Sequence, residues 1–454
     1  MFKDSIIFSN INKFLAFSQE KCEYLCENSV FIKNIDNLIL FTILAVLLCS
    51  AFASSDVLGY VGLVTIFLTV IKLFVKKGEK LDGTLFEFFL LAYFLIVIIS
   101  LSGSSLFYLS LKGFLKTFTY LGFYFSAVQY FKNNKSKIWW AVGAIALSAS
   151  IESLIGLVQS FAQVDEISGW QDMSQINPED VLTRVYGTLQ PFNPNLLGGY
   201  FVAAFPCLLG CAIYNLVQKK YMLASFATVF AILVAYTTIL TGCRGAYLGL
   251  FAMLLVTFCF LGKYIWQVGS EKLKKIYLST IGGLSAFFVA LVLFVSSIRT
   301  RVVSIFVMRE DSSTSFRLNV YHSAFNMIKD NWLLGIGLGN QNFREIYGLY
   351  MRTGFDALSA YSIYLETAVE SGIFALFAFL AFVGTFLYKA VKFVIGDYKF
   401  EDVILVGIAL VSVVGVMVHG FVDTVFFRPQ LQFAFWTLIA SSSAILKINA
   451  DENI

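Results

Sequence analysis

Apolar runs of about 20 residues recur along the chain and are separated by shorter polar stretches. A helix needs roughly 20 apolar residues to cross the core of a bilayer, whereas a barrel strand needs only about ten. The pattern therefore predicts an all-α polytopic membrane protein with about 12 transmembrane helices. The runs lie near residues 38–54, 57–75, 85–102, 106–131, 138–162, 196–216, 221–241, 244–262, 278–298, 363–388, 402–420 and 430–447.

The polar interruptions suggest how the chain is organised. Residues 1–36 are mixed in character and are expected to form a cytoplasmic or interfacial N-terminal segment, followed by a transmembrane domain over 37–447 and a cytoplasmic tail over 448–454. Two long interruptions, 163–195 and 299–362, are predicted outer segments, and the larger is a loop between helices nine and ten. Apolar spacing within its residues 312–332 predicts a helix lying on the outer membrane surface.

Composition supports the membrane assignment. The 454-residue chain is 58% hydrophobic and only 14% charged, whereas about a quarter of residues are charged in soluble proteins. We therefore expect membrane lipids around it and no nucleic-acid partner. Its seven cysteines are scattered and show no spacing for a disulfide framework or a zinc site.

Lysines and arginines separate along the chain. With a cytoplasmic N-terminus, 21 of the 24 lysines fall on inner segments, and all nine arginines fall on outer ones. The lysines fit an inner-membrane protein with both termini in the cytoplasm, but the outer arginines break the positive-inside preference. Long loops cross the membrane whatever their charge, which explains the arginines from 299 to 352 but not Arg244 in a short turn. Because guanidinium groups bind phosphate or carboxylate bidentately, the arginines indicate an outer anion site.

Two loop-to-helix junctions carry candidate anion ligands. Arg184 precedes Asn193-Pro194-Asn195, where Asn195 is a candidate N-cap for the next helix. Arg244 lies in a glycine-bounded turn, again beside an outward helix N-terminus, which attracts anions. The alternative for the Arg184 segment is an ordinary loop-to-helix junction. The alternative for Arg244 is a side chain that reaches the lipid headgroups.

A third group of candidate site residues lies at the end of the eleventh apolar run. His419 and Asp423 are four residues apart, and share one face if the helix continues that far. The carboxylate would then raise the basicity of the imidazole, although a structural hydrogen bond is an equal alternative. No cluster has the ligand spacing of a catalytic metal, so we expect neither a metal nor another cofactor. Three alternating glycines at 335, 337 and 339 favour a packed turn over a phosphate loop.

These stretches together resemble the O-antigen ligase and polymerase superfamily over about residues 184–436. The resemblance rests on Arg184 to Asn195, on the Arg244 turn, on Arg317 through Asp330 to Gly337, and on Tyr361-Ser362 with Gly372. In their residues, the stretches 356–372 and 419–430 are more similar to the IctB-type branch, which is often labelled a bicarbonate transporter.

The resemblance implies a metal-independent membrane glycosyltransferase. Its partners would be a polyprenyl-pyrophosphate-linked glycan and a lipid or glycan acceptor, with Arg184, Asn193, Asn195, Arg244 and Arg317 binding the pyrophosphate. Ligases of the family have a histidine where this chain has Tyr361, so His419, Asp423 or another carboxylate would have to act as the base. A bicarbonate transporter or accessory protein, and a non-catalytic scaffold of envelope assembly, are the competing hypotheses.

Overall fold

The computed structural model describes residues 6–162, 184–294, 299 and 313–452. Every regular element in these ranges is a helix, which confirms the predicted all-α class. In chain order the elements are α1 (Ile6–Lys21), α2 (Glu23–Asn28), α3 (Val30–Lys33), α4 (Ile35–Cys49), α5 (Ser55–Val75), α6 (Leu85–Gly103), α7 (Phe107–Asn133), η1 (Lys135–Lys137), α8 (Ile138–Ala162), α9 (Pro194–Val217), α10 (Tyr221–Leu240), α11 (Arg244–Val268), α12 (Glu271–Phe294), α14 (Ser313–Asp330), α15 (Asn340–Tyr347), α16 (Ile363–Ile395), α17 (Phe400–His419), η3 (Val425–Phe427) and α18 (Pro429–Glu452).

Each of the twelve predicted apolar runs coincides with a helix in its described residues, namely α4 to α12 and α16 to α18; residues 295–298 of the ninth run lie outside the described ranges. Within the described ranges, nine helices are long and apolar enough to cross a membrane. The remaining three of the twelve are α4, which has only 15 residues, α7 and α12. The chain is therefore a multi-pass membrane protein, and the count of twelve spans stays a prediction.

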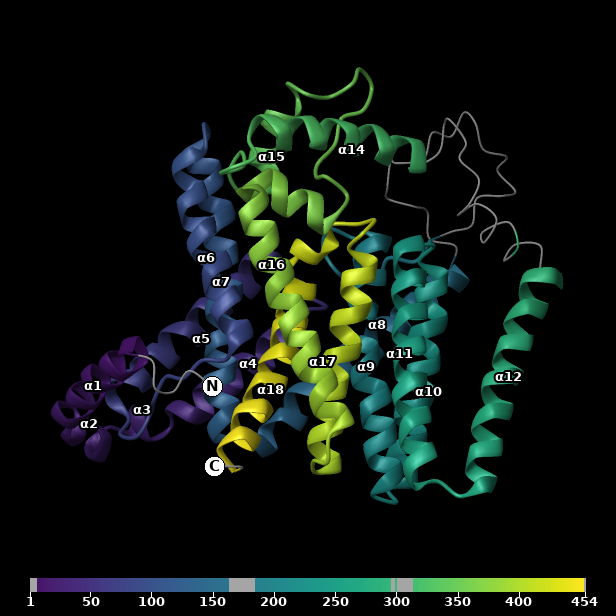
Figure 1. Ribbon diagram of the computed structural model, residues 1–454, viewed down its shortest axis with the longest axis horizontal. Helices are drawn as coiled ribbons and strands as arrows, with labels where there is room; N and C mark the ends of the chain where they lie inside the picture. Colours follow the sequence, from purple (N-terminus) through teal and green to yellow (C-terminus); the bar gives the residue numbers. More distant parts are fainter. Residues whose placement is uncertain (1–5, 163–183, 295–298, 300–312, 453–454) are drawn as a thin grey trace.

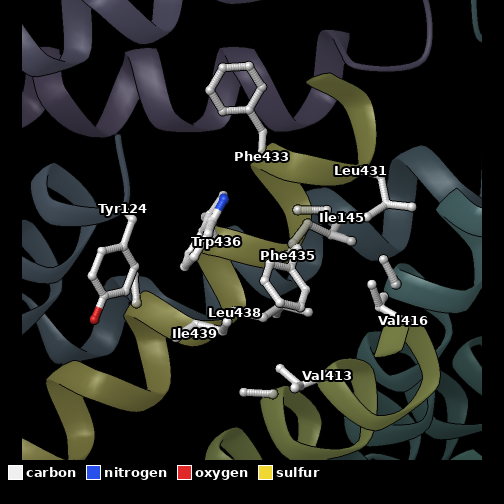
Figure 2. Packing of buried hydrophobic residues seen from close by; sticks show 14 of the residues in the cluster. Tyr124, Ile145, Val413, Val416, Leu431, Phe433, Phe435, Trp436, Leu438 and Ile439 are labelled. Carbon is white, nitrogen blue, oxygen red and sulfur yellow. The ribbon is translucent and has the colours of Figure 1, made fainter. Parts of the chain in front are cut away.

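The centre of the bundle is formed by α9, α17 and α18, whose most apolar stretches are 78%, 78% and 89% buried. Figure 2 shows Phe433, Phe435 and Trp436 projecting from α18 in different directions into this core. Phe433 meets Phe123 of α7 edge-to-face at 4.9 Å between ring centroids, and Phe435 meets Phe426 in the same way at 5.0 Å. Such aromatic pairs add specific geometry to the packing of the core.

Small residues let α11 approach the central α17 closely. A Cβ atom added at Gly249 would lie 2.9 Å from the carbonyl oxygen of Gly415 and 3.1 Å from a methyl group of Val202. Glycine at such positions allows membrane helices to pack backbone to backbone. This packing fixes the beginning of α11 against the end of α17.

Lysines gather at one of the two ends of the bundle. Figure 1 shows α14 crossing one end, opposite the turn between α11 and α12. Lysine-rich turns and buried ion pairs lie at the other end, where Lys447 binds Asp82 and Glu87 at 3.0 Å each. Burial alone would raise the pKa of Asp82, but Lys447 and Lys132 together hold it below its ordinary value.

The predicted surface helix within 312–332 is α14 (Figure 1). Residues 163–183 of the first outer segment, and Arg301 and Arg309 of the second, lie outside the described ranges. At the N-terminus, α1 is joined to the end of α5 and the turn after it, because Asn12 donates to the carbonyl oxygen of Leu81 at 2.9 Å and Gln19 to that of Leu73 at 2.8 Å.

Candidate functional site

The segment that carries Arg184 is fixed to α8 by two polar side chains. Gln159 accepts hydrogen bonds from the backbone N–H groups of Tyr186 and Gly187, at 3.1 and 2.9 Å. Glu152, fully buried, accepts from the backbone N–H of Thr188 at 2.9 Å and from its hydroxyl. Glu152 drew attention in the sequence only as an ionisable group of an apolar run that would suit a transporter, and neither it nor Gln159 was predicted to hold this segment, because both lie on a helix far from it in the chain.

Arg184 joins this segment to the turn between α10 and α11. Its Nε atom donates to the carbonyl oxygen of Thr241 at 2.8 Å, and its Nη2 atom donates to Oδ1 of Asn195 at 2.7 Å. Gly242, with φ of +66°, permits this contact, since a Cβ atom there would lie 2.9 Å from Nε of Arg184. Asn195 therefore orients a guanidinium group instead of capping the helix.

The N-cap of α9 is Asn193, so the predicted capping role of Asn195 was wrong. Oδ1 of Asn193 accepts the backbone N–H of Asn195 at 2.8 Å, and Pro194 is the first helical residue. Proline at this position has no N–H to leave unpaired, which explains why the helix begins two residues earlier than expected.

Arg244 is the first residue of α11 and is half-buried. Both Arg184 and Arg317 act electrostatically on it, so three guanidinium groups from three separate segments share one region. Cys243 is the N-cap of α11. It interacts electrostatically with the same two arginines and with Asp423. The structure thus brings the predicted arginines together beside a helix N-terminus, where a partial positive charge adds to theirs.

Arg317 reaches this region from α14. Its Nη2 atom lies 3.6 Å from Oδ2 of Asp423, and its guanidinium carbon lies 5.7 Å from the centre of the Tyr361 ring. Burial raises the pKa of Tyr361 to about 12, with Asp423 adding to the rise and Arg317 opposing it. Tyr361 is therefore protonated at neutral pH and can donate a hydrogen bond, but it is a poor base.

His419 is the last residue of α17 and is 1% exposed. Its Nε2 atom lies 3.6 Å from Sγ of Cys243. The imidazole is enclosed by two glycines, since a Cβ atom would lie 3.0 Å from the ring at Gly199 and 2.7 Å at Gly245. These glycines allow α9 and α11 to close around the ring.

Asp423 lies beyond the end of α17, so the predicted helical spacing between His419 and Asp423 does not apply. The two side chains are nevertheless close, because the carboxylate acts electrostatically on the imidazole. Oδ1 of Asp423 accepts the backbone N–H groups of Thr424 and Val425 at 2.7 and 3.0 Å. In the described part of the chain Oδ2 has no hydrogen-bond partner, although Asp423 is only 4% exposed.

Residues 229–380 match the family model described as O-antigen ligase. This segment, about a third of the chain, is therefore similar to the O-antigen ligase family. It contains Arg244, Arg317 and Tyr361, while Arg184 and His419 lie on either side of it. No curated protein sequence matches the chain.

Among the residues that the structure describes, the site includes one group of possible metal ligands. One ligand atom each from Cys243, His419 and Asp423 lies within 4.8 Å of the other two. These residues are up to 180 positions apart, so their spacing in the sequence gave no sign of the group. The guanidinium groups around it repel a cation at short range, and the charge of the site favours an anion instead.

Two further carboxylates lie in the stretch 356–372 that carries part of the resemblance, but no role in the site was predicted for them. Glu366 and Glu370, one turn apart on α16, are 1% and 8% exposed. Glu366 accepts the backbone N–H of Ala360, and Oε1 of Glu370 accepts that of Gly339 at 2.7 Å. The glycine-rich segment at 335–339 is thus a packed turn, as expected, held against α16 where that helix is broken at Gly372.

Replacing Gly245 by alanine is expected to destabilise the protein by about 1–3 kcal/mol, because the new methyl group would overlap the His419 ring. The matched control is Gly407→Ala in α17, where a Cβ atom meets nothing within 4 Å. Alanine is the better helix former, so this control should gain up to about 1 kcal/mol. Thermal unfolding of the purified proteins measures both, and equal melting temperatures would contradict the packing described here.

Proposed function

We propose that the chain transfers a glycan from a polyprenyl-pyrophosphate carrier to an acceptor hydroxyl at the outer leaflet, in cell-surface polysaccharide assembly. The observation that supports this most is the meeting of Arg184, Arg244 and Arg317 beside the N-terminus of α11. Three fixed positive charges and a helix dipole suit a pyrophosphate better than a singly charged anion. The O-antigen ligase match agrees with this substrate class.

In the proposed reaction the oxygen of the acceptor bonds to the anomeric carbon as the bond from that carbon to the pyrophosphate oxygen breaks. The configuration inverts, and polyprenyl pyrophosphate leaves with the bonding electrons. The arginines stabilise the negative charge that develops on the leaving group, which is where such charges lower the barrier most. Asn193 and Asn195 have positioning roles: Asn193 caps α9, and Asn195 holds the guanidinium group of Arg184.

The acceptor proton goes to Asp423. Oδ2 of this carboxylate, which no hydrogen bond occupies among the described residues, lies beside Arg317 at the arginine cluster. His419 is more deeply enclosed and contacts Cys243, so its part is to position the Asp423 loop and to share the proton. Tyr361 binds as a hydrogen-bond donor.

The orientation proposed from the charges places α14 and the arginines outside, in a bacterial inner membrane. Residues 1–36 and 448–454 are then cytoplasmic, and 163–195 and 299–362 are outer segments of the domain 37–447. This is the side on which a carrier-linked glycan and its acceptor meet.

Tyr361→Phe is expected to lower the transfer rate by less than about tenfold, the loss of one hydrogen bond. Since the pKa of Tyr361 is about 12, the tyrosine stays neutral from about pH 6 to about pH 9. The variant should therefore keep the pH profile of the wild type over that range. A basic limb of the rate profile that disappears in Tyr361→Phe would show that the phenol does transfer protons.

Reconstituted protein tests the proposal against the bicarbonate hypothesis. Proteoliposomes that contain the purified chain, a polyprenyl-pyrophosphate-linked glycan and a lipid acceptor should form the glycosylated acceptor. The same vesicles should take up labelled bicarbonate no faster than protein-free vesicles. Bicarbonate uptake without transfer would overturn the proposal.

A further inference from the structure

A second site lies on the other side of the loop that carries Asp423. A cavity of about 60 Å³ is lined by α6, α7, α16, α18 and residues 338–340, and Phe426 and Phe427 of the same loop form one wall. Arg428 interacts electrostatically both with Asp423 and with Tyr120 of the cavity wall. One loop thus separates the arginine cluster from the cavity, and Arg428 links the two.

The cavity has a polar mouth and a polar group in its inner wall. Lys116 and Asn340 are exposed and border it, while Glu370 lines it from within and is 8% exposed. Lys116 and Glu370 interact electrostatically, but in the described part of the chain no ion pair within 4.0 Å joins them. One acidic and one basic side chain border the space, so neither an anion nor a cation is favoured as the occupant.

The remaining walls are aromatic and amide groups. Rings of Tyr93, Tyr120, Phe379 and Trp436 line the space, and Gln432 accepts the indole N–H of Trp436 and so fixes that ring. Binding sites for neutral ligands combine such apolar faces with a few placed polar groups. At roughly 15 Å³ for each water-sized position, the volume corresponds to about four waters, comparable to one hydroxyl-bearing edge of a sugar ring.

We propose that this cavity is a saccharide subsite, in which Glu370, Lys116 and Asn340 bind hydroxyl groups and the aromatic rings cover the apolar face of the sugar. As a place for the acceptor sugar it rests on the proposed function, because the acceptor must approach the arginine cluster across the Asp423 loop. Sugar binding itself requires no carrier, so it can be measured separately.

The test is saturation-transfer NMR on the full-length protein in lipid nanodiscs free of sugar detergents, with methyl glucoside, methyl galactoside and methyl N-acetylglucosaminide as probes. We expect transfer to at least one glycoside, and about tenfold weaker binding in Glu370→Gln and in Lys116→Met, since each removes a charged hydrogen bond. Lys112→Met, one turn away on the exposed face of α7 and outside the cavity, should bind as the wild type does.

Three outcomes would overturn the subsite: no transfer to any of the glycosides, equal binding by wild type and Lys116→Met, or the same loss in Lys112→Met. Glu370→Gln could fail to fold because Oε1 of Glu370 also accepts the backbone N–H of Gly339. In that case Lys116→Met alone decides the test. Arg244→Ala should keep its sugar signal. A normal sugar signal together with failed glycan transfer by the wild type would reject the proposed function and leave the subsite standing.

Discussion

Arg244→Ala is expected to abolish assembly of the surface glycan while the protein still inserts in the membrane. Arg244 is the guanidinium on which Arg184 and Arg317 converge, so its loss weakens stabilisation of the leaving pyrophosphate. Removing one such group lowers a catalytic rate by about 10²- to 10³-fold. Gel profiles of the glycan, with immunoblots of the membrane fraction, measure the effect in cells.

The matched control is Arg344→Ala. Arg344 lies in the segment 299–362 together with Arg317, but it is exposed and pairs with Asp356 at 3.0 Å. An exposed ion pair contributes little to stability, so this variant should give a normal glycan profile. A normal profile in Arg244→Ala too would show that the cluster binds no substrate.

Asp423→Asn is expected to reduce transfer by about 10²- to 10⁴-fold, the usual contribution of a general base. The amide oxygen still accepts the N–H groups of Thr424 and Val425, so the local fold should survive. What the variant loses is the negative charge beside Arg317. In vitro transfer with a fixed carrier substrate measures the rate, and a thermal melt checks the fold.

Asp356→Asn, the exposed partner of Arg344, serves as the control for losing a carboxylate. His419→Gln should have a smaller effect than Asp423→Asn if the carboxylate accepts the proton. Should Asp423→Asn transfer at nearly the wild-type rate while His419→Gln is inactive, the imidazole is the base and Asp423 only positions Arg317.

Much of the fold could be predicted because membrane helices are encoded locally. A run of about 20 apolar residues has to satisfy its backbone within itself, so each of the twelve runs became a helix. That Arg184, Arg244 and Arg317 lie near one another was foreseeable too, from arginines placed beside helix N-termini, while anion binding stays a prediction. All three arginines were identified from the sequence, and their roles stay predictions.

The rest depends on contacts that no local pattern encodes. Cys243 meets His419 across 176 positions, and Glu152 holds Thr188 from another helix. The start of one helix was also misjudged: α9 begins at Pro194 with Asn193 as its N-cap, whereas Asn195 was the predicted N-cap. Glu370 lay in an apolar run, which gave no sign that its side chain lines a cavity.

Binding of undecaprenyl pyrophosphate tests the central claim most directly. Native mass spectrometry of the wild type and of the variant with Arg184, Arg244 and Arg317 all changed to alanine would compare this lipid with its monophosphate. We predict that the wild type retains the pyrophosphate more strongly than the monophosphate, and that the triple variant loses this preference. Equal retention of both lipids by both proteins would contradict the account.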